Sequence, residues 1–435
     1  MADSLPDAGP SGNPANGSPT KNTRSAVAVT VAAVALSAIG NVAAYKIVTW
    51  VGTPELFMAY SSDRRYLTFV LPVLMFGAGV SLALRIAIRP DPAESIRILY
   101  GQLGVAAVAG AALALFLAVV PYSVYSAIVP GVSREETLAL LAAAVALNAT
   151  GMLYAYDRGF QEFRHGAVVM VLANGVFPCL AALFIMRGVA ASFFIWAVLC
   201  GVLAVLTLLR LPRPSRGLVT QLGLLVRSSL SRVPGEIAYG AVFLIPVVEF
   251  ASVTDPIARS VFNYAFVLFG LLTAVASPIA TVMLPIIGTI VATDGRGAAR
   301  QLYLGNLALG LGAGVLMATT LTWQGPLIIE TLMAAEYVPE APLLGRLAPA
   351  VVGLALFLFL RSIIDGLGER ALTSALSLGG LFAYVLTRLA TGSMEHVTSV
   401  VTATNMSFGV LGLSTTVVAA YHFRRSAAGR TSNTG

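Results

Sequence analysis

Long apolar stretches alternate with short polar segments along most of the chain. A helix needs about 20 apolar residues to cross a hydrocarbon core about 30 Å thick, and most of these stretches reach that length. The pattern therefore predicts an all-α polytopic membrane protein with about twelve transmembrane helices. The expected spans lie near residues 26–48, 66–88, 99–120, 137–156, 166–186, 189–209, 237–253, 258–286, 301–323, 343–364, 372–390 and 397–421.

Lysines and arginines give an independent test of this count, because cytoplasmic loops of membrane proteins carry an excess of both residues. The chain has 27 of them. With the N-terminus inside, 19 fall on the inner side and seven on the outer side, while Lys46 lies within the first span. The bias persists to Arg424 and Arg425. We therefore expect a multi-pass protein of the plasma membrane with both termini in the cytosol.

The longest inner connection divides the predicted spans six and six. Residues 1–25, rich in Pro, Gly, Ser and Asn, are expected to form a disordered cytosolic tail. We expect a first six-helix bundle at 26–209, a connecting segment at 210–234, a second bundle at 235–421 and a cytosolic tail at 422–435. Two halves of six helices would have the same orientation, with an axis along the membrane normal.

Composition narrows the function classes. Only 11% of the residues are charged and 57% are hydrophobic, whereas a soluble domain carries roughly 25% charged residues. The formal net charge of +7 is not gathered into a basic block with interleaved aromatics, so we expect no nucleic-acid partner. The sequence has no phosphate-binding loop, zinc-ligand spacing or nucleophile elbow, so we expect neither a cofactor nor an enzyme. The glycines at 310, 312 and 314 are expected to pack helices.

Charged groups within the spans are the first candidates for a site, because a charge at membrane depth is costly and usually faces a cavity or a partner. Lys46 lies near the outer end of the first span and Glu249 occupies a similar place in the seventh. The two could face each other across a central cavity, although Lys46 could instead extend its ammonium to the headgroups. Arg361 and Asp365 are four residues apart and could form an intrahelical pair or anchor the helix end.

Further polar residues lie at the ends of spans or within them. Arg85 closes the second span and Arg232 introduces the seventh. Both could act as topology anchors, or hold a diphosphate with forked hydrogen bonds. Most of the asparagines within spans are expected to form hydrogen bonds between helices. These are Asn41, Asn148, Asn174 and Asn263.

Three short segments resemble one family of transporters. Residues 77–85, Gly-Ala-Gly-Val-Ser-Leu-Ala-Leu-Arg, are similar to the end of the second helix of bacterial lipid-linked oligosaccharide flippases. These flippases form the polysaccharide-export branch of the multidrug/oligosaccharidyl-lipid/polysaccharide superfamily. Residues 232–246, beginning Arg-Val-Pro-Gly-Glu, resemble the entry into their seventh helix, and residues 283–287, Met-Leu-Pro-Ile-Ile, resemble the end of their eighth.

The resemblance implies a MATE-like transporter with two six-helix bundles arranged as a V. Its substrate would be a polyprenyl-diphosphate-linked oligosaccharide, flipped from the inner to the outer leaflet for cell-surface polysaccharide biosynthesis. The expected partners are this lipid-linked glycan, membrane lipids, and the glycan polymerase and glycosyltransferases of the same pathway.

On this hypothesis, the charged residues divide into two roles. The predicted substrate-binding residues are Lys46, Arg85, Arg232 and Arg361. The predicted ion-coupling residues are Glu249 and Asp365. The sequence departs from the family in placing few cations deep in its predicted spans.

Two other functions stay open. A multidrug exporter of the same superfamily would favour an acidic or aromatic cavity. A polytopic glycosyltransferase or polymerase would need charged groups collected on sizeable outer loops, whereas the outer loops expected here are short.

Overall fold

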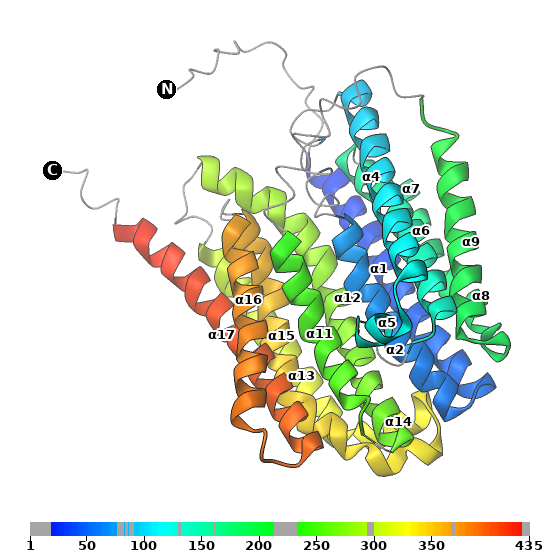
Figure 1. Cartoon of the computed structure of the whole chain (residues 1–435). Coiled ribbons are helices and arrows are strands. Elements are labelled where there is room, and N and C mark those ends of the chain that lie inside the picture. The colour runs from blue at the N-terminus through cyan, green and yellow to red at the C-terminus, as the bar shows by residue number, and fades with distance from the viewer. Residues whose placement is uncertain are drawn as a thin grey trace.

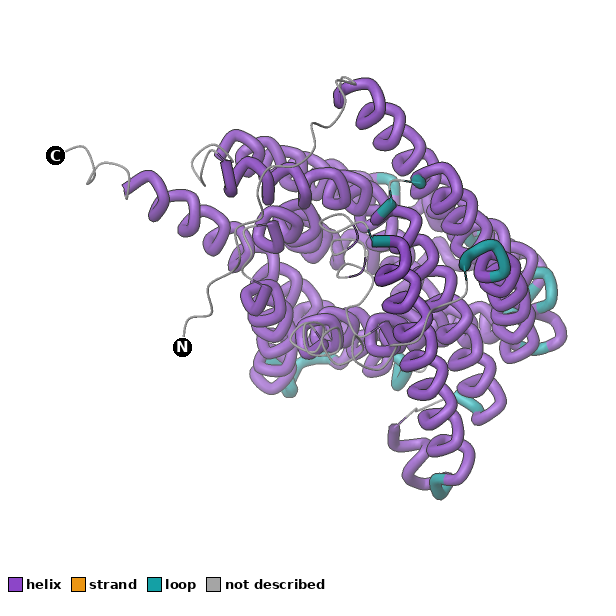
Figure 2. Tube along the Cα trace, turned by 90° about the horizontal axis from the view of Figure 1, so that it is seen from above, coloured by secondary structure: helices purple, strands orange, loops and turns teal. Residues whose placement is uncertain are grey.

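The computed structural model describes residues 19–75, 82, 86, 91–128, 132–160, 162–212, 233–253, 255–293, 300–366 and 370–428. Within these residues the regular elements are helices, and Figure 2 shows them joined by short loops. The first half contains α1 (Pro19–Val51), α2 (Pro54–Met75), α4 (Pro92–Val119), α5 (Tyr122–Ile128), α6 (Arg134–Gly159), α7 (Phe163–Val171), η1 (Leu172–Val176), α8 (Phe177–Ala182), η2 (Ile185–Arg187) and α9 (Val189–Leu208). The second half contains α11 (Val233–Phe250), α12 (Pro256–Thr293), α13 (Arg300–Trp323), α14 (Gly325–Leu332), η3 (Ala335–Glu340), α15 (Pro342–Gly366), α16 (Arg370–Ala390) and α17 (His396–Ala428).

Eleven helical segments of the described chain are long and apolar enough to cross a membrane. The helix α2, which has 22 residues, is of similar length but carries too many charges to be counted with them. With α2 included, the helices form two bundles of six. The prediction of an all-helical polytopic membrane protein with two six-helix bundles is confirmed.

The second span differs from the prediction. We expected it at residues 66–88, with Arg64 and Arg65 in the outer loop before it. In the structure α2 begins at Pro54, and both arginines lie inside the helix. Proline suits the first turn of a helix because the missing N–H has no partner there in any case. The loop assignment was wrong because hydropathy cannot distinguish a solvated run of charges from one buried against polar and aromatic partners.

The fifth span of the first bundle is one continuous rod built from α7, the π-helical turn η1 and α8. Pro178 follows η1 and has no N–H to donate to the preceding turn, which explains a local change in the hydrogen-bond ladder. Gly175 of η1 meets Gly40 of α1 so closely that a Cβ on Gly40 would lie 2.5 Å from the Gly175 Cα. Small residues therefore let α1 approach this rod backbone to backbone.

The two bundles meet through a reciprocal set of contacts. The helix α1 packs against α12, and α2 packs against α11. The first helix of each half thus contacts the second helix of the other half, as expected for two halves related by a twofold axis. Figure 1 also shows that α1 begins and α17 ends at one end of the bundle, and that α14 lies at the other end. We call the end where α14 lies the α14 end.

Close helix packing also holds the second bundle together. Gly310 and Gly314 of α13 lie against α15, which confirms the packing role expected for these two glycines. A Cβ on Gly412 of α17 would lie 2.7 Å from the Cα of Gly353 on α15, so the two backbones are in contact.

This contact predicts a clear difference between two glycines of α17. Gly412→Ala should destabilise the protein by about 1–3 kcal/mol, because its methyl group would overlap backbone that cannot move aside easily. The measurement is the apparent unfolding temperature in detergent. Gly409→Ala is the matched control, since nothing lies within 4 Å of its added Cβ. Equal unfolding temperatures for the two variants would contradict the packing described here.

Candidate functional site

The helix α2 carries three consecutive charged residues, Asp63, Arg64 and Arg65, within the first bundle. Arg64 lies ten residues from the start of α2, which is about 15 Å along a helix. Asp63 and Arg65 have exposed fractions of only 2% and 9%. Charges at such a position need partners or a polar cavity, so the surroundings of the two guanidinium groups decide what they do.

Arg64 is held by neutral groups. Its Nη2 donates to the Oδ1 of Asn41 and its Nη1 to the phenol oxygen of Tyr60 at 3.3 Å. The guanidinium carbon lies 5.0 Å from the ring centre of Tyr45 and 4.8 Å from that of Trp196, both within the range of cation–π attraction. We call these five residues the Arg64 site. Aromatic faces and amide oxygens orient an arginine but leave its positive charge uncancelled.

No carboxylate of the described residues lies within 4.0 Å of the guanidinium nitrogens of Arg64 or Arg65. The Nε of Arg65 is buried and has no hydrogen-bond partner. The Oδ2 of Asp63 is likewise buried and unpartnered. This part of the first bundle therefore contains two arginines whose charges the described chain does not pair.

Arg65 faces the seam between the bundles. Ser62 and Phe69 lie three residues before it and four residues after it, so the three side chains share one face of α2. Asn263 of α12 donates to Ser62 Oγ at 3.0 Å, and a Cβ on Gly240 of α11 would lie 3.0 Å from Phe69 Cδ2. Arg65 thus lies between two points at which α2 touches the second bundle.

The seam is closed by aromatic rings toward the α14 end. Tyr45 and Phe57 of the first bundle lie 6.2 and 6.1 Å from Tyr264 of α12, measured between ring centres. Phe57 also lies 6.2 Å from Tyr337 of η3. Burial raises the pKa of Tyr337, so its phenol stays uncharged. The rings therefore seal the seam with apolar surface on the side of the Arg64 site nearer the α14 end.

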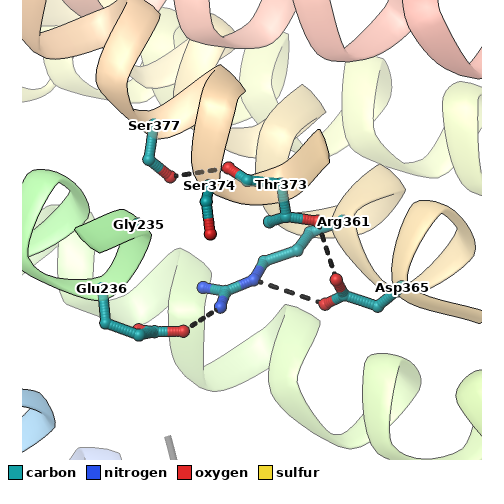
Figure 3. A pocket seen from close by; sticks show the side chains of 7 residues that line it. All are labelled: Gly235, Glu236, Arg361, Asp365, Thr373, Ser374 and Ser377. Carbon is teal, nitrogen blue, oxygen red and sulfur yellow. Dashed lines mark hydrogen bonds and ion pairs between the residues drawn. The ribbon is translucent and has the colours of Figure 1, made fainter. Parts of the chain in front are cut away.

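A second charged cluster lies in the second bundle, where α11, α15 and α16 meet (Figure 3). Arg361 forms an ion pair with Glu236 and a second one with Asp365, at 3.6 Å between Nε and Oδ2. Thr373 donates to Asp365 Oδ1 at 2.7 Å. The intrahelical pair expected between Arg361 and Asp365 is confirmed. Its residues line a cavity of about 10 Å³, which has room for about one water. We call this cluster the Arg361 pocket.

The Arg361 pocket contains one cation and two carboxylates. Its formal charge is therefore −1 when both acids are ionised. Ser374 and Ser377 add hydroxyl oxygens to the lining. Oxygen donors around a net negative charge can take up a proton or a small cation, so the arrangement is compatible with the ion-coupling role predicted for Asp365.

Lys46 and Glu249 are not brought together. Lys46 Nζ donates to the backbone carbonyl of Met333, after α14, at 2.9 Å, and so links the two bundles. Glu249 pairs with Arg388 of α16 and accepts a hydrogen bond from Tyr384 at 3.2 Å. Neither residue faces the other across a cavity, and the charge of Glu249 is already balanced.

The remaining predicted residues are two arginines and four asparagines. Arg85 and Arg232 lie outside the described residues. Asn148 donates to Leu74 O at 3.3 Å and Asn263 donates to both Ser61 and Ser62, which confirms two of the expected contacts between helices. A third contact joins Asn41 to Arg64, whereas Asn174 bonds within its own helix.

Sequence reasoning missed Arg64, Arg65 and Glu236 as candidate site residues. The available clue was the proline at position 54. Starting the second span at Pro54 would have placed Asp63, Arg64 and Arg65 within it. Glu236 gave no such clue, because its role depends on Arg361, which lies 125 residues further along the chain.

Comparison with known proteins identifies the fold. No protein-family model matches the chain, and no curated sequence matches it significantly. Among solved structures, a multidrug resistance MATE family transporter of the MOP superfamily in an inward-facing conformation has a TM-score of 0.72 and 14% identity, covering 92% of this chain and 99% of that one. An outward-facing conformation of a multidrug resistance MATE family transporter of the MOP superfamily has a TM-score of 0.69 and 15% identity, covering 95% of this chain and 97% of that one.

A third similar structure is a MOP superfamily transporter from Pyrococcus furiosus, for which a binding pocket of reverse polarity suggests a different function. Its TM-score is 0.69 and its identity 15%, with coverage of 94% of this chain and 96% of that one. At these identities the likeness shows the fold, and this chain has the MATE-like fold of MOP superfamily transporters. The narrower resemblance to the polysaccharide-export branch stays a prediction.

A double substitution tests the ion pairs of the Arg361 pocket. Arg361→Gln should lower stability by about 3 kcal/mol, because it leaves the partly buried carboxylates of Glu236 and Asp365 without their cation. Adding Glu236→Gln to that variant should restore part of the loss, as one of the unpaired charges is then removed. Thermal unfolding in detergent at pH 7 measures both effects. An additive loss in the double variant would contradict the pairing.

Proposed function

We propose that this protein is a transporter that flips a polyprenyl-diphosphate-linked oligosaccharide from the inner to the outer leaflet of the plasma membrane, for cell-surface polysaccharide biosynthesis. The observation that carries the proposal is the pair of arginines on α2 that no carboxylate of the described chain neutralises. A buried uncompensated cation is costly unless an anion joins it. A diphosphate supplies that anion.

Arginine suits this substrate better than lysine would. Its planar guanidinium can hold two phosphate oxygens at once, and such charge-assisted pairs are stronger than neutral hydrogen bonds. The rings around Arg64 already orient the guanidinium, so less side-chain freedom is lost on binding. Lys46, Arg85, Arg232 and Arg361 remain proposed as further substrate-binding residues.

Alternating access by rocking of the two bundles would provide the movement. Among the described residues, the side-chain contacts that close the seam include aromatic edges, a serine–asparagine pair and the bond from Lys46 to a backbone carbonyl. Such contacts can separate without breaking either bundle. Structures with this fold include both inward-facing and outward-facing conformations, which supports the proposal. With the termini in the cytosol, the sealed α14 end would face outward.

An ion gradient would reset the cycle. We propose the Arg361 pocket, with Asp365 and Glu236, as the site where the coupling ion binds. Glu249 is the alternative carboxylate, although its pairing with Arg388 leaves it less available. The partner enzymes would be glycosyltransferases that build the lipid-linked glycan and a polymerase that extends it, and they would work on the substrate before and after its transfer.

The second candidate is a multidrug exporter for cationic compounds. The negative formal charge of the Arg361 pocket and the multidrug transporters among the similar structures favour it. The unpaired arginines on α2 disfavour it, because they would repel a cationic drug from the first bundle.

A flipping assay tests the role of Arg64. In proteoliposomes, Arg64→Gln should lower the rate of lipid-linked oligosaccharide transfer at least about tenfold, since a lost charge-assisted hydrogen bond is worth about 1.5–3 kcal/mol. Arg64→Lys should give a transfer rate between those of the wild type and Arg64→Gln, because lysine keeps the positive charge but loses the planar guanidinium that holds two oxygens at once. Arg187→Gln is the matched control, as this arginine is exposed in η2.

Two outcomes would count against the proposal. Full transfer by the double variant Arg64→Gln/Arg65→Gln, at matched protein level, would remove its main support. Transport of a cationic dye by the wild type, without transfer of the lipid-linked glycan, would favour the exporter instead.

A further inference from the structure

A cavity of about 190 Å³ lies next to the charged segment of α2. Its walls come from α2, α4, α6 and α11, and they are mostly leucine, valine and aromatic side chains, among them Val70, Leu117, Leu140 and Leu244. The hydroxyl of Thr137, a polar group on the wall, is already bonded to Tyr125 at 2.6 Å. The lining therefore offers little to hold water.

The size and lining of the cavity limit what can fill it. An apolar cavity of about 150 Å³ in a soluble protein stays dry and binds benzene. A larger apolar space at membrane depth likewise suits a hydrocarbon group, because an empty space leaves its walls without dispersion contacts. The natural occupant is therefore a segment of a lipid chain.

The position of the cavity points to one particular lipid. Tyr66 and Phe69, which line it, follow Arg65 by one and four residues, so the cations and the apolar space adjoin along a single helix. Leu244 belongs to α11, so the cavity also spans the seam between the bundles. A molecule with a diphosphate head and a hydrocarbon tail matches both features at once.

We propose that this cavity binds a segment of the branched polyprenyl chain while the arginines of α2 hold the diphosphate. The inference rests on the proposed function and adds a site for the lipid part of the substrate. Because one wall belongs to the second bundle, rocking of the bundles would open the cavity and release the chain together with the head.

Binding of two probes distinguishes recognition of the diphosphate head from recognition of the hydrocarbon tail of the substrate. The protein is placed in nanodiscs with the exposed Trp50 and Trp323 replaced by phenylalanine, so that Trp196, 4.8 Å from Arg64, reports binding by fluorescence. Inorganic diphosphate and farnesyl diphosphate are titrated. We expect farnesyl diphosphate to bind at least tenfold more tightly than inorganic diphosphate.

Leu117→Phe, which fills the cavity, should reduce that ratio at least fivefold and leave the affinity for inorganic diphosphate unchanged. Leu115→Phe is the matched control on the same helix, since Leu115 is 66% exposed, and should keep the ratio. An unchanged ratio in Leu117→Phe would overturn the cavity assignment. So would equal competition by hexadecyl phosphate, which would indicate an ordinary straight lipid chain.

The two proposals fail in different ways. If inorganic diphosphate gives no response in any variant, the proposed function loses its basis. If it binds but farnesyl diphosphate binds no better, only the cavity assignment fails. Should Leu117→Phe not fold, photolabelling of the wild type with a photoreactive farnesyl diphosphate decides. Labels on α2, α4 or α6 support the assignment, and labels confined to α16 or α17 overturn it.

Discussion

Positive charge on α2 that no carboxylate of the described residues matches is the constraint on which the first bundle depends. Arg64 and Arg65 lie in a helix that must pass through an apolar bundle, and removing a guanidinium from water is expensive. The surrounding helices meet this constraint in part. The helix α1 contributes an amide and a phenol ring, and α9 contributes an indole ring. Together they fix the direction of Arg64 but do not cancel its charge.

The arginines of the two charged clusters are paired differently. In the second bundle, Arg361 pairs with two carboxylates and Arg388 with one, so the charges of both arginines are balanced. Among the residues that the structure describes, no carboxylate pairs with Arg64 or Arg65 of the first bundle. This asymmetry distinguishes two halves with the same helix order.

The sequence predicted the helix number, the six-and-six division and the ion pair between Arg361 and Asp365, because these follow from hydropathy and helical periodicity. It placed the second span twelve residues too late, because the charged segment at 63–65 resembles a loop when read alone. It could not reveal the link between Glu236 and Arg361, or that between Glu249 and Arg388, because each pair is separated by more than 120 residues of sequence. Contacts between distant helices depend on packing, which a linear pattern does not encode.

The bond from Lys46 to the carbonyl of Met333 has a consequence for sequence variation. A backbone acceptor exists whatever side chain stands at its position, so evolution could exchange residue 333 for any residue that packs as well and keep the link. Its geometry depends instead on the length of the connection between α14 and η3. One residue inserted there would move the carbonyl away from the ammonium. The link to Lys46 therefore constrains the length of this short turn, while the packing of Met333 constrains its composition.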